Sequence, residues 1–147
     1  MSLADMERFL RRHKVVGLDS NILIYLIEAH PQYQDFCKKI FTSIESGRNL
    51  GICSTVSLLE ILVQPYRKKD DETVNRCYGL LTTYPHLAWV ELSVAIADLA
   101  AQLRAQYRLK TPDAIILATA LDSGATGLIA NDVQLKRVAE LELLVLN

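Results

Sequence analysis

The sequence has few of the features that mark membrane-bound, secreted or disulfide-stabilised proteins. Its three cysteines, Cys37, Cys53 and Cys77, include no CxxC pair, and an odd number of separated cysteines favours reduced packing residues over disulfides or a zinc site. No apolar run approaches the roughly 18 residues that a membrane-spanning helix needs. The opening stretch MSLADMERFLRRHK lacks the apolar segment of a secretory signal. We therefore expect a soluble, cytoplasmic protein with no membrane contact.

Strong net charge and linker-like segments are also absent. The formal net charge is -1, so contact with nucleic acid would need local basic patches or metal ions rather than attraction by the whole molecule. No tract rich in Gly, Ser or Pro is long enough to be an interdomain linker, and no internal repeat is present. We predict a single domain over residues 1–147, in which residues 1–14 form an N-terminal helical extension.

Short apolar runs alternate with longer segments of helical pattern. The predicted strands are residues 15–18, 50–53, 87–92, 126–130 and 143–147, and the predicted helices between them are residues 22–29, 33–46, 54–65, 71–84, 94–107, 111–124 and 132–140. The clearest helix has Thr111 at its cap, Pro112 at its first position and Gly124 just beyond its end. Short apolar strands separated by helices predict an α/β fold, with a parallel sheet covered by helices on both faces.

Acidic residues occur where strands end and helices begin. Asp19 directly follows the strand at 15–18, Asp132 follows the strand at 126–130, and Asp113 lies in the first turn of its helix. Ligands of open parallel sheets bind beyond the carboxyl ends of the strands, so we expect these carboxylates to converge with Glu60 at one edge. Structural explanations compete, because the helix dipole favours an acid at Asp113 and because Asp19 and Asp132 are also suited to capping or turn positions.

Glu60 is the carboxylate that capping explains least well. It stands in the apolar segment SLLEILV, and an ionised carboxylate is seldom buried without a partner. Four converging carboxylates either raise one another's pKa or need cations between them. Divalent ions that prefer oxygen ligands, magnesium in particular, fit this set, whereas the lack of nitrogen and sulfur ligands argues against zinc. The chemistry that suits such a site is metal-assisted displacement at phosphorus.

Three segments, in this order, resemble the PIN-domain ribonucleases, and especially the VapC-like toxins of bacterial toxin–antitoxin pairs. VVGLDSNILIYLIE resembles the opening strand with its first Asp, CSTVSLLEIL is similar to the segment with the Glu, and TPDAIILATALDSGATGLIANDVQL resembles the last part. The resemblance covers nearly the whole chain from Val15. It implies a three-layer α/β/α fold, PIN-like and Rossmann-like, with a short twisted parallel sheet. It also implies hydrolysis of RNA that depends on Mg²⁺ or Mn²⁺.

The resemblance also implies roles for individual residues. It assigns the catalytic and metal-binding positions to Asp19, Glu60, Asp113 and Asp132, and supporting polar positions to Ser20, Asn21 and Asn131. In this hypothesis Asp19 and Asp113 hold the main ion, Glu60 binds it or orients its water, and Asp132 completes the first site or attracts a second ion. One departure from the family is Ala130, where Thr or Ser is usual; another is Ser20 in place of Thr, which keeps a hydroxyl.

Several basic residues could contact an RNA substrate. Candidate RNA-binding residues are Arg67, Lys68, Lys69, Arg108 and Lys110. The family implies a homodimer and a cognate antitoxin protein. An alternative is a catalytically inactive PIN fold that binds RNA or protein as a scaffold, which Ala130 favours and the complete acidic set opposes. A phosphatase of the haloacid dehalogenase kind is opposed by Asn21, because that family needs a second Asp there.

Overall fold

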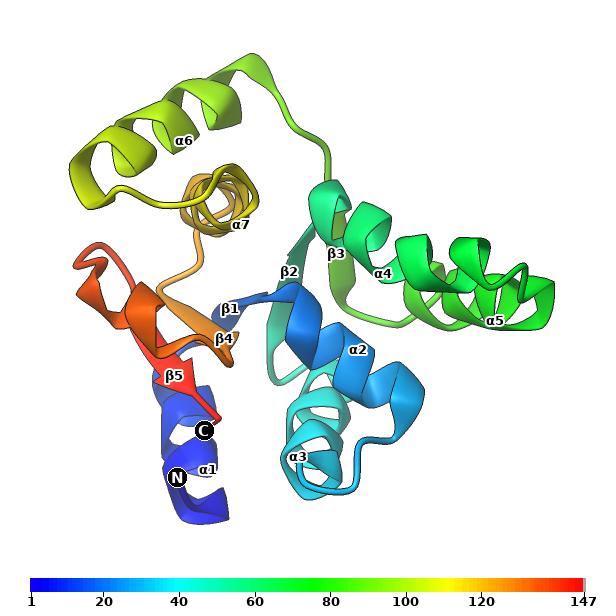
Figure 1. The fold of residues 1–147 in the computed structure, drawn as a ribbon. Coiled ribbons are helices and arrows are strands. Elements are labelled where there is room, and N and C mark those ends of the chain that lie inside the picture. Colours follow the sequence, from blue (N-terminus) through cyan, green and yellow to red (C-terminus); the bar gives the residue numbers. More distant parts are fainter. Residues whose placement is uncertain (147) are drawn as a thin grey trace.

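The computed structural model describes residues 1–146 and shows an α/β fold built on one five-stranded sheet (Figure 1). The strands are β1 (Val15–Leu18), β2 (Leu50–Ser54), β3 (Leu87–Val90), β4 (Gly127–Ala130) and β5 (Glu142–Val145). All neighbouring strands are parallel, in the order β3-β2-β1-β4-β5. The strand order reverses between β1 and β4, and this is where open parallel sheets form a crevice at their carboxyl ends.

Helices cover both faces of the sheet, as predicted. They are α1 (Leu3–Arg12), α2 (Ser20–Glu28), α3 (Gln34–Glu45), α4 (Thr55–Arg67), α5 (Asp71–Thr82), α6 (Val94–Tyr107) and α7 (Thr111–Asp122), with a 3₁₀ helix, η1 (Val133–Arg137), before β5. Helices α6 and α7 lie on one face, and α1, α2 and α3 lie on the other (Figure 1). Within residues 1–146, no helix is both long and apolar enough to cross a membrane.

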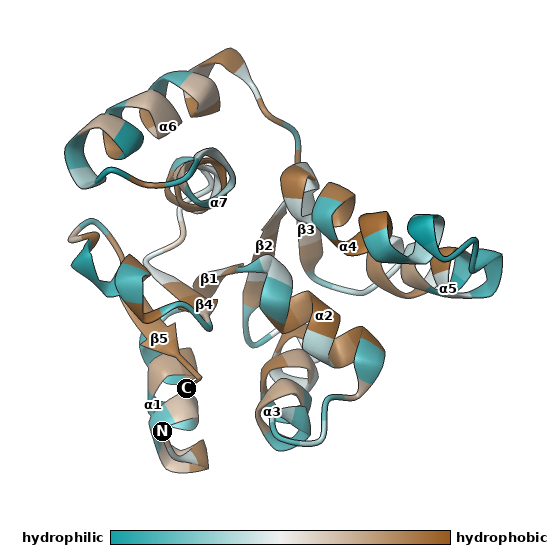
Figure 2. Cartoon of the chain, in the orientation of Figure 1, coloured by the Kyte–Doolittle hydropathy of each residue, from teal (hydrophilic) through white to brown (hydrophobic). Residues whose placement is uncertain are grey.

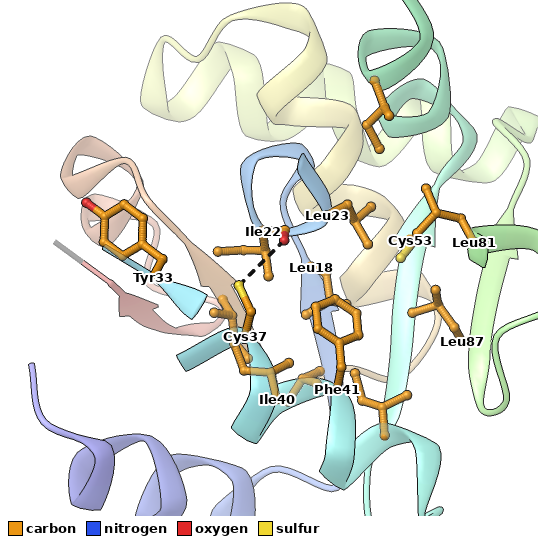
Figure 3. Close-up of a cluster of buried hydrophobic side chains, with 14 of the residues drawn as sticks. Leu18, Ile22, Leu23, Tyr33, Cys37, Ile40, Phe41, Cys53, Leu81 and Leu87 are labelled. Atoms are coloured by element: carbon orange, nitrogen blue, oxygen red, sulfur yellow. Dashed lines mark hydrogen bonds between the residues drawn. The ribbon is translucent and has the colours of Figure 1, made fainter. Parts of the chain in front are cut away.

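The larger hydrophobic cluster joins the sheet to α1, α2, α3, α4 and α5. Figure 3 shows part of it, with side chains of β1, α2 and α3 packed together. Val16 and Leu18 point from β1 into this cluster, because alternate residues of a strand face the same side. The three cysteines are free thiols buried in the same cluster, which confirms their predicted role in packing: they are Cys37, Cys53 and Cys77.

The second cluster lies under α6 and α7 and fixes α7 against the sheet. Leu128 and Ala130 of β4 face this cluster, whereas Ile129 between them faces the first. Gly17 of β1 makes the close approach possible, because a Cβ atom there would lie 2.7 Å from Ala120 Cβ. Helix α7, which carries Asp113 in its first turn, is thereby packed directly on β1.

The predicted cap of the clearest helix, α7, is wrong by a residue. The cap of α7 is Lys110, not Thr111, and Lys110 makes no side-chain capping bond. The helix begins earlier because the Lys110 carbonyl already accepts a hydrogen bond from the amide of Ala114 (3.0 Å). Pro112 is tolerated in this first turn because amides there have no partner within the helix.

Candidate active site

The four predicted carboxylates come from four elements. Asp19 follows β1 and caps α2, and Asp132 follows β4 and caps η1. Glu60 lies in the middle of α4, and Asp113 lies in the first turn of α7. Strands β1 and β4 are paired neighbours, so the two aspartates that follow them lie at the same edge of the sheet, on either side of the point where the strand order reverses.

Asp19 is the most enclosed of the four, with 7% of its surface exposed. Its Oδ1 accepts a hydrogen bond from the amide of Ser20 (2.8 Å), and its own amide donates to the carbonyl of Ile129 in β4 (3.0 Å). Burial raises the pKa of Asp19 to about 6, the bond from Ser20 opposes that rise, and the other three carboxylates add to it. The Ser20 amide therefore fixes the carboxyl group in place, and ionising it costs free energy because it is buried among other carboxylates.

Asp113 is affected by the same neighbours. Burial raises the pKa of this half-buried carboxyl; the charges of Asp132 and Glu60 add to the rise, and Lys110 opposes it. Since each of these two aspartates responds to the other carboxylates, the structure brings all four predicted acids within electrostatic range. Burial, with this repulsion added to it, makes ionised carboxylates costly at this edge.

Capping and site geometry coincide at two of the positions. Asp132 accepts a hydrogen bond from the amide of Gln134 (3.0 Å), as Asp19 does from Ser20, so the capping roles considered from the sequence are observed. A cap uses one oxygen of a carboxylate to accept an amide. The other oxygen of each side chain remains available to a ligand.

The setting expected for Glu60 is wrong, because its side chain is exposed. Successive residues of a helix turn by about 100°, so Ile61 and Leu62 face the core while Leu59 and Glu60 face outward. The exposed carboxylate is nevertheless directed toward the site: the Ser20 hydroxyl donates to Glu60 Oε1 (2.7 Å). Ser20 also hydrogen-bonds the buried hydroxyl of Ser57 (3.0 Å), which connects α2 to α4.

The supporting polar residues differ in their surroundings. Asn131 is partly buried, and its Nδ2 donates to the hydroxyl of Tyr25 (2.7 Å). Tyr25 stacks on Tyr33 at 4.6 Å between ring centroids. The Asn131 Oδ1 atom is buried and has no hydrogen-bond partner among residues 1–146, an arrangement that costs roughly 1–3 kcal/mol unless water or a ligand donates to it. Asn21, by contrast, is exposed.

Ala130 packs in the apolar cluster beneath α7 and is fully buried. Where the family usually has Thr or Ser, this chain thus has a methyl group that packs in the cluster between β4 and α7. A hydroxyl at this position would itself need a hydrogen-bond partner within that cluster.

A cavity of about 160 Å³ joins two of the acids to basic side chains. Its lining contains Asp113 and Asp132 together with Arg108, Lys110 and Arg137. Arg137 was not predicted from the sequence, where its only signal is its place five residues after Asp132. Its Nη2 donates to the Arg108 carbonyl (3.4 Å), so the two basic residues are in contact.

The other predicted RNA-binding residues lie elsewhere. Lys68 lines a second cavity of about 270 Å³ together with Glu60, between α2, α4 and α5. Arg67 and Lys69 line neither cavity. The structure thus places Arg108 and Lys110 beside the acidic edge, places Lys68 near Glu60, and leaves the other two apart.

The chemistry of the donor set fits a hard divalent cation. All four candidate ligands are carboxylates. The pKa values of Asp19 and Asp113 are raised by burial and, to a smaller extent, by the neighbouring carboxylates, and a bound cation would offset both effects. Within residues 1–146, no three His, Cys, Asp or Glu side chains are gathered closely enough to ligate one ion by themselves. Magnesium commonly binds through one or two carboxylates and keeps several waters, so the residues present suit that ion without a closed cage.

Comparison with solved structures shows the same fold. VapBC2 from Rickettsia felis, solved with a DNA fragment of its promoter, is similar with a TM-score of 0.69 and 20% identity, over 89% of this chain and 98% of that chain. A toxin–antitoxin complex from Klebsiella pneumoniae gives a TM-score of 0.67 and 24% identity, over 88% and 96% of the two chains. VapC20 from Mycobacterium tuberculosis, a toxin that cleaves the sarcin–ricin loop, gives 0.60 and 13%, over 77% and 86%.

Sequence comparison identifies the family. The sequence matches none of the curated proteins with which it was compared. It does match the PIN domain family over residues 16–141, a span that begins within β1 and includes all four carboxylates. With most of the chain covered and the fold shared with VapBC proteins, this protein belongs to the PIN domain family.

Proposed function

We propose that the protein is an endoribonuclease that depends on Mg²⁺ or Mn²⁺ and acts in the cytoplasm as the toxin of a toxin–antitoxin pair. The observation that carries this proposal is the crowding of four carboxylates at the edge where β1 and β4 end, with the pKa values of two of them raised. Membership of the PIN domain family and the likeness to VapC structures support it.

Asp19 and Asp113 are the residues proposed to hold the cation. Asp19 is positioned by the Ser20 amide, and Asp113 lies at the start of a helix packed directly on β1. When bound, a divalent ion offsets the negative charge of the phosphate and lowers the pKa of a coordinated water. Asp132 would contribute to the same ion or to a second one.

Glu60 is proposed to orient the attacking water. Its Oε1 is occupied by the Ser20 hydroxyl, which leaves Oε2 free to accept a proton from that water. The carboxylate is exposed and therefore accessible from the solvent side of the site. In-line attack at phosphorus would leave a 5′-phosphate and a 3′-hydroxyl.

Arg108, Lys110 and Arg137 are proposed to bind phosphates that flank the cleaved bond. They line the cavity that contains Asp113 and Asp132, and guanidinium groups bind phosphate oxygens in pairs. These positive charges also reduce the repulsion between an acidic site and a polyanionic substrate, which matters in a chain of net charge -1.

Cleavage of end-labelled RNAs by the purified protein tests the proposal. We expect cutting with Mg²⁺ or Mn²⁺ and none with EDTA. Asp113→Asn should remove it, whereas Asp122→Asn should not, because Asp122 is exposed at the other end of the same helix. If no RNA is cut with any metal while the folded protein still binds RNA, the scaffold function replaces this proposal.

The proposed antitoxin contact is the cavity of about 270 Å³ beside Glu60. Its walls include Ile24, Ile27, Ile61 and Pro65, and Figure 2 shows α2 as hydrophobic over much of its length. An apolar segment of a partner lying there would approach Glu60 directly. Ile24→Glu should then abolish binding of a candidate antitoxin and leave RNA cleavage intact; unchanged binding would place the contact elsewhere.

The proposed dimer contact lies at the start of α6. Val94 is 88% exposed and Leu92 is 48% exposed, and Leu92 lines an apolar cavity of about 300 Å³ between α6 and α7. Large apolar side chains exposed together are typical of contact surfaces. Sedimentation of Val94→Glu should show a monomer where the original chain is a dimer; a dimer of unchanged strength would exclude this face.

A further inference from the structure

A further cavity lies at the amino-terminal edge of the sheet, opposite the edge that carries the four carboxylates. It has a volume of about 570 Å³ and is formed between α1 and α3, where α3 leads into β2. None of the four carboxylates lines it. Its lining includes four basic side chains and a single acidic one: Arg11, Lys14, Lys39, Arg48 and Glu7. We refer to it below as the α1–α3 pocket.

The positive charges of this pocket exceed what the one carboxylate neutralises. Glu7 forms an ion pair with Lys39. The Lys39 ammonium holds the pKa of Glu7 below its usual value, with smaller effects from Arg11 and Arg48. These three positive charges therefore lie around the Glu7 carboxylate. Within residues 1–146, Arg11, Lys14 and Arg48 form no salt bridge with any carboxylate. The pocket therefore carries an excess of three positive charges.

Buried hydrogen bonds fix the floor of the pocket. Asn49 Nδ2 donates to the carbonyls of Leu10 (2.9 Å) and His13 (2.6 Å), and its Oδ1 accepts from the Ser43 hydroxyl. Asn49 and Ser43 are both buried. These bonds join the end of α1 to the end of α3 and the start of β2, so the two basic walls keep a constant separation.

The α1 wall is also anchored to the far side of the sheet. His13 hydrogen-bonds Thr126 (2.7 Å) and Glu142 (2.6 Å) through its two ring nitrogens. Phe9 packs against Gly127 so closely that a Cβ atom there would lie 2.6 Å from the ring. The match to the PIN domain family begins at residue 16, so this wall is an addition to the part of the chain that defines the family.

Helix dipoles account for only part of this charge. Arg11 lies in the last turn of α1, where a positive charge is stabilised by the carboxyl end of the helix. Lys39 lies in the middle of α3, and Lys14 lies outside both helices. A rigid concave surface with excess positive charge suits the binding of phosphate groups.

We propose that the α1–α3 pocket is a second phosphate-binding site, which holds the backbone of the RNA substrate at a distance from the cleaved bond. The inference rests on the proposed ribonuclease function. The pocket and the carboxylates lie at opposite ends of β1, since Lys14 precedes this strand and Asp19 follows it. The chain from Lys14 to Asp19, at about 3.3 Å per residue, spans roughly 16 Å. A short RNA therefore reaches only one of the two sites, and a longer RNA reaches both.

The test compares two double variants that remove equal charge. Arg11→Gln/Arg48→Gln takes one cation from each wall of the pocket, whereas Arg8→Gln/Lys38→Gln takes one cation each from α1 and α3 outside the pocket lining. All four side chains are exposed, so folding should be unaffected. RNA affinity is measured by fluorescence anisotropy in EDTA over a range of salt concentrations with a long single-stranded RNA, and cleavage in Mg²⁺ is measured with that RNA and a short one.

For the long RNA, we expect the pocket variant to bind roughly tenfold more weakly than the control variant near 0.1 M salt. The slope of log affinity against log salt should become shallower by about 1.4, since each phosphate contact of a single strand contributes about 0.7. A short RNA is cut only when it lies at the carboxylate edge, where it does not reach the pocket, so the two variants should cleave it with equal kcat/KM in Mg²⁺. In cleavage assays, KM for the long RNA should rise while kcat stays within about twofold.

Equal affinities of the two variants for the long RNA would overturn the proposal. So would binding of inorganic phosphate or AMP that is lost in the pocket variant while RNA affinity is unchanged, because the pocket would then serve a small anion. Binding in EDTA does not require catalysis. A protein that binds RNA through the pocket but cuts none would contradict the ribonuclease function and not the pocket.

Discussion

The polar groups at the two edges of the sheet differ in whether they have partners within the protein. At the amino-terminal edge, Asn49 uses both its amide nitrogen and its oxygen in hydrogen bonds, and both ring nitrogens of His13 have partners. At the carboxyl edge, Asp19 and Asp113 face charges of their own sign, and Asn131 Oδ1 has no partner among residues 1–146.

Polar groups that stabilise the fold have partners within the protein, whereas polar groups that bind a ligand lack them until the ligand is bound. A buried polar group normally has its partners within the protein, as Asn49 does. Like charges and an unsatisfied acceptor that persist at one edge reduce stability, and a bound cation with its waters would remove that cost. Perturbed carboxylates in a crevice are therefore candidates for function.

The largest expected effect is on cleavage by Asp19→Asn. The amide oxygen of Asn can still accept the Ser20 amide bond, so the start of α2 should be unchanged. Loss of the charge should lower kcat/KM by roughly 10²–10³-fold or more. The measurement is RNA cleavage with Mg²⁺. A variant that cleaves RNA at the original rate would show that Asp19 does not hold the ion.

The pH dependence of stability tests the same edge without catalysis. In the folded protein the pKa of Asp19 is about 6, above its ordinary 3.8, so the folded state binds more protons between these values. The contribution of Asp19 to the free energy of unfolding is therefore fully present below pH 3.8 and is lost as the pH rises through about 6. The difference is on the order of 3 kcal/mol.

Denaturation in EDTA at several pH values measures this difference. Relative to the original chain, Asp19→Asn should gain stability progressively from about pH 4 to pH 7, since it has no charge to bury. Acids outside the site titrate equally in both proteins and cancel in the comparison, whereas Asp113, Glu60 and Asp132 lose the repulsion of Asp19 in the variant, which adds to its gain. Parallel stability curves for the two proteins would mean that the fold does not raise the pKa of Asp19.

At the amino-terminal edge, Asn49→Ala should destabilise the fold and spare the chemistry. Two carbonyls lose a donor and Ser43 loses an acceptor, which should cost about 2–3 kcal/mol. Thermal unfolding measures the loss, and kcat of the folded fraction should be unchanged. Asn75→Ala, at an exposed position on α5, is the control. Equal melting temperatures for the two variants would refute the role given to Asn49.

The smallest effect is expected for Ala130→Ser. Ala130 is fully buried in the cluster under α7, so an added hydroxyl should cost about 1 kcal/mol of stability and change kcat by less than about threefold. Unfolding and cleavage are measured on the same preparation. A much larger gain in kcat would show that the hydroxyl acts at the site, and that its absence here limits the enzyme.

The sequence predicted the parallel sheet and its strands because apolar runs of this kind are local signals. It also located the edge where Asp19 and Asp132 lie, since residues that follow parallel strands share an edge. The exposure of Glu60 depends on which side of α4 packs against α2, and this is not visible in a helix that is apolar in sequence. The placement of Arg137 and the Asn49 network depend on contacts between distant segments.

Calorimetric titration of Mg²⁺ into the protein at pH 7.5 tests the central claim most directly, with Asp19→Asn/Asp113→Asn as the comparison. We predict saturable binding by the original chain and none by the double variant, which remains folded. Equal heats for the two proteins, or no binding by either, would contradict the claim that the crowded carboxylates form a cation site.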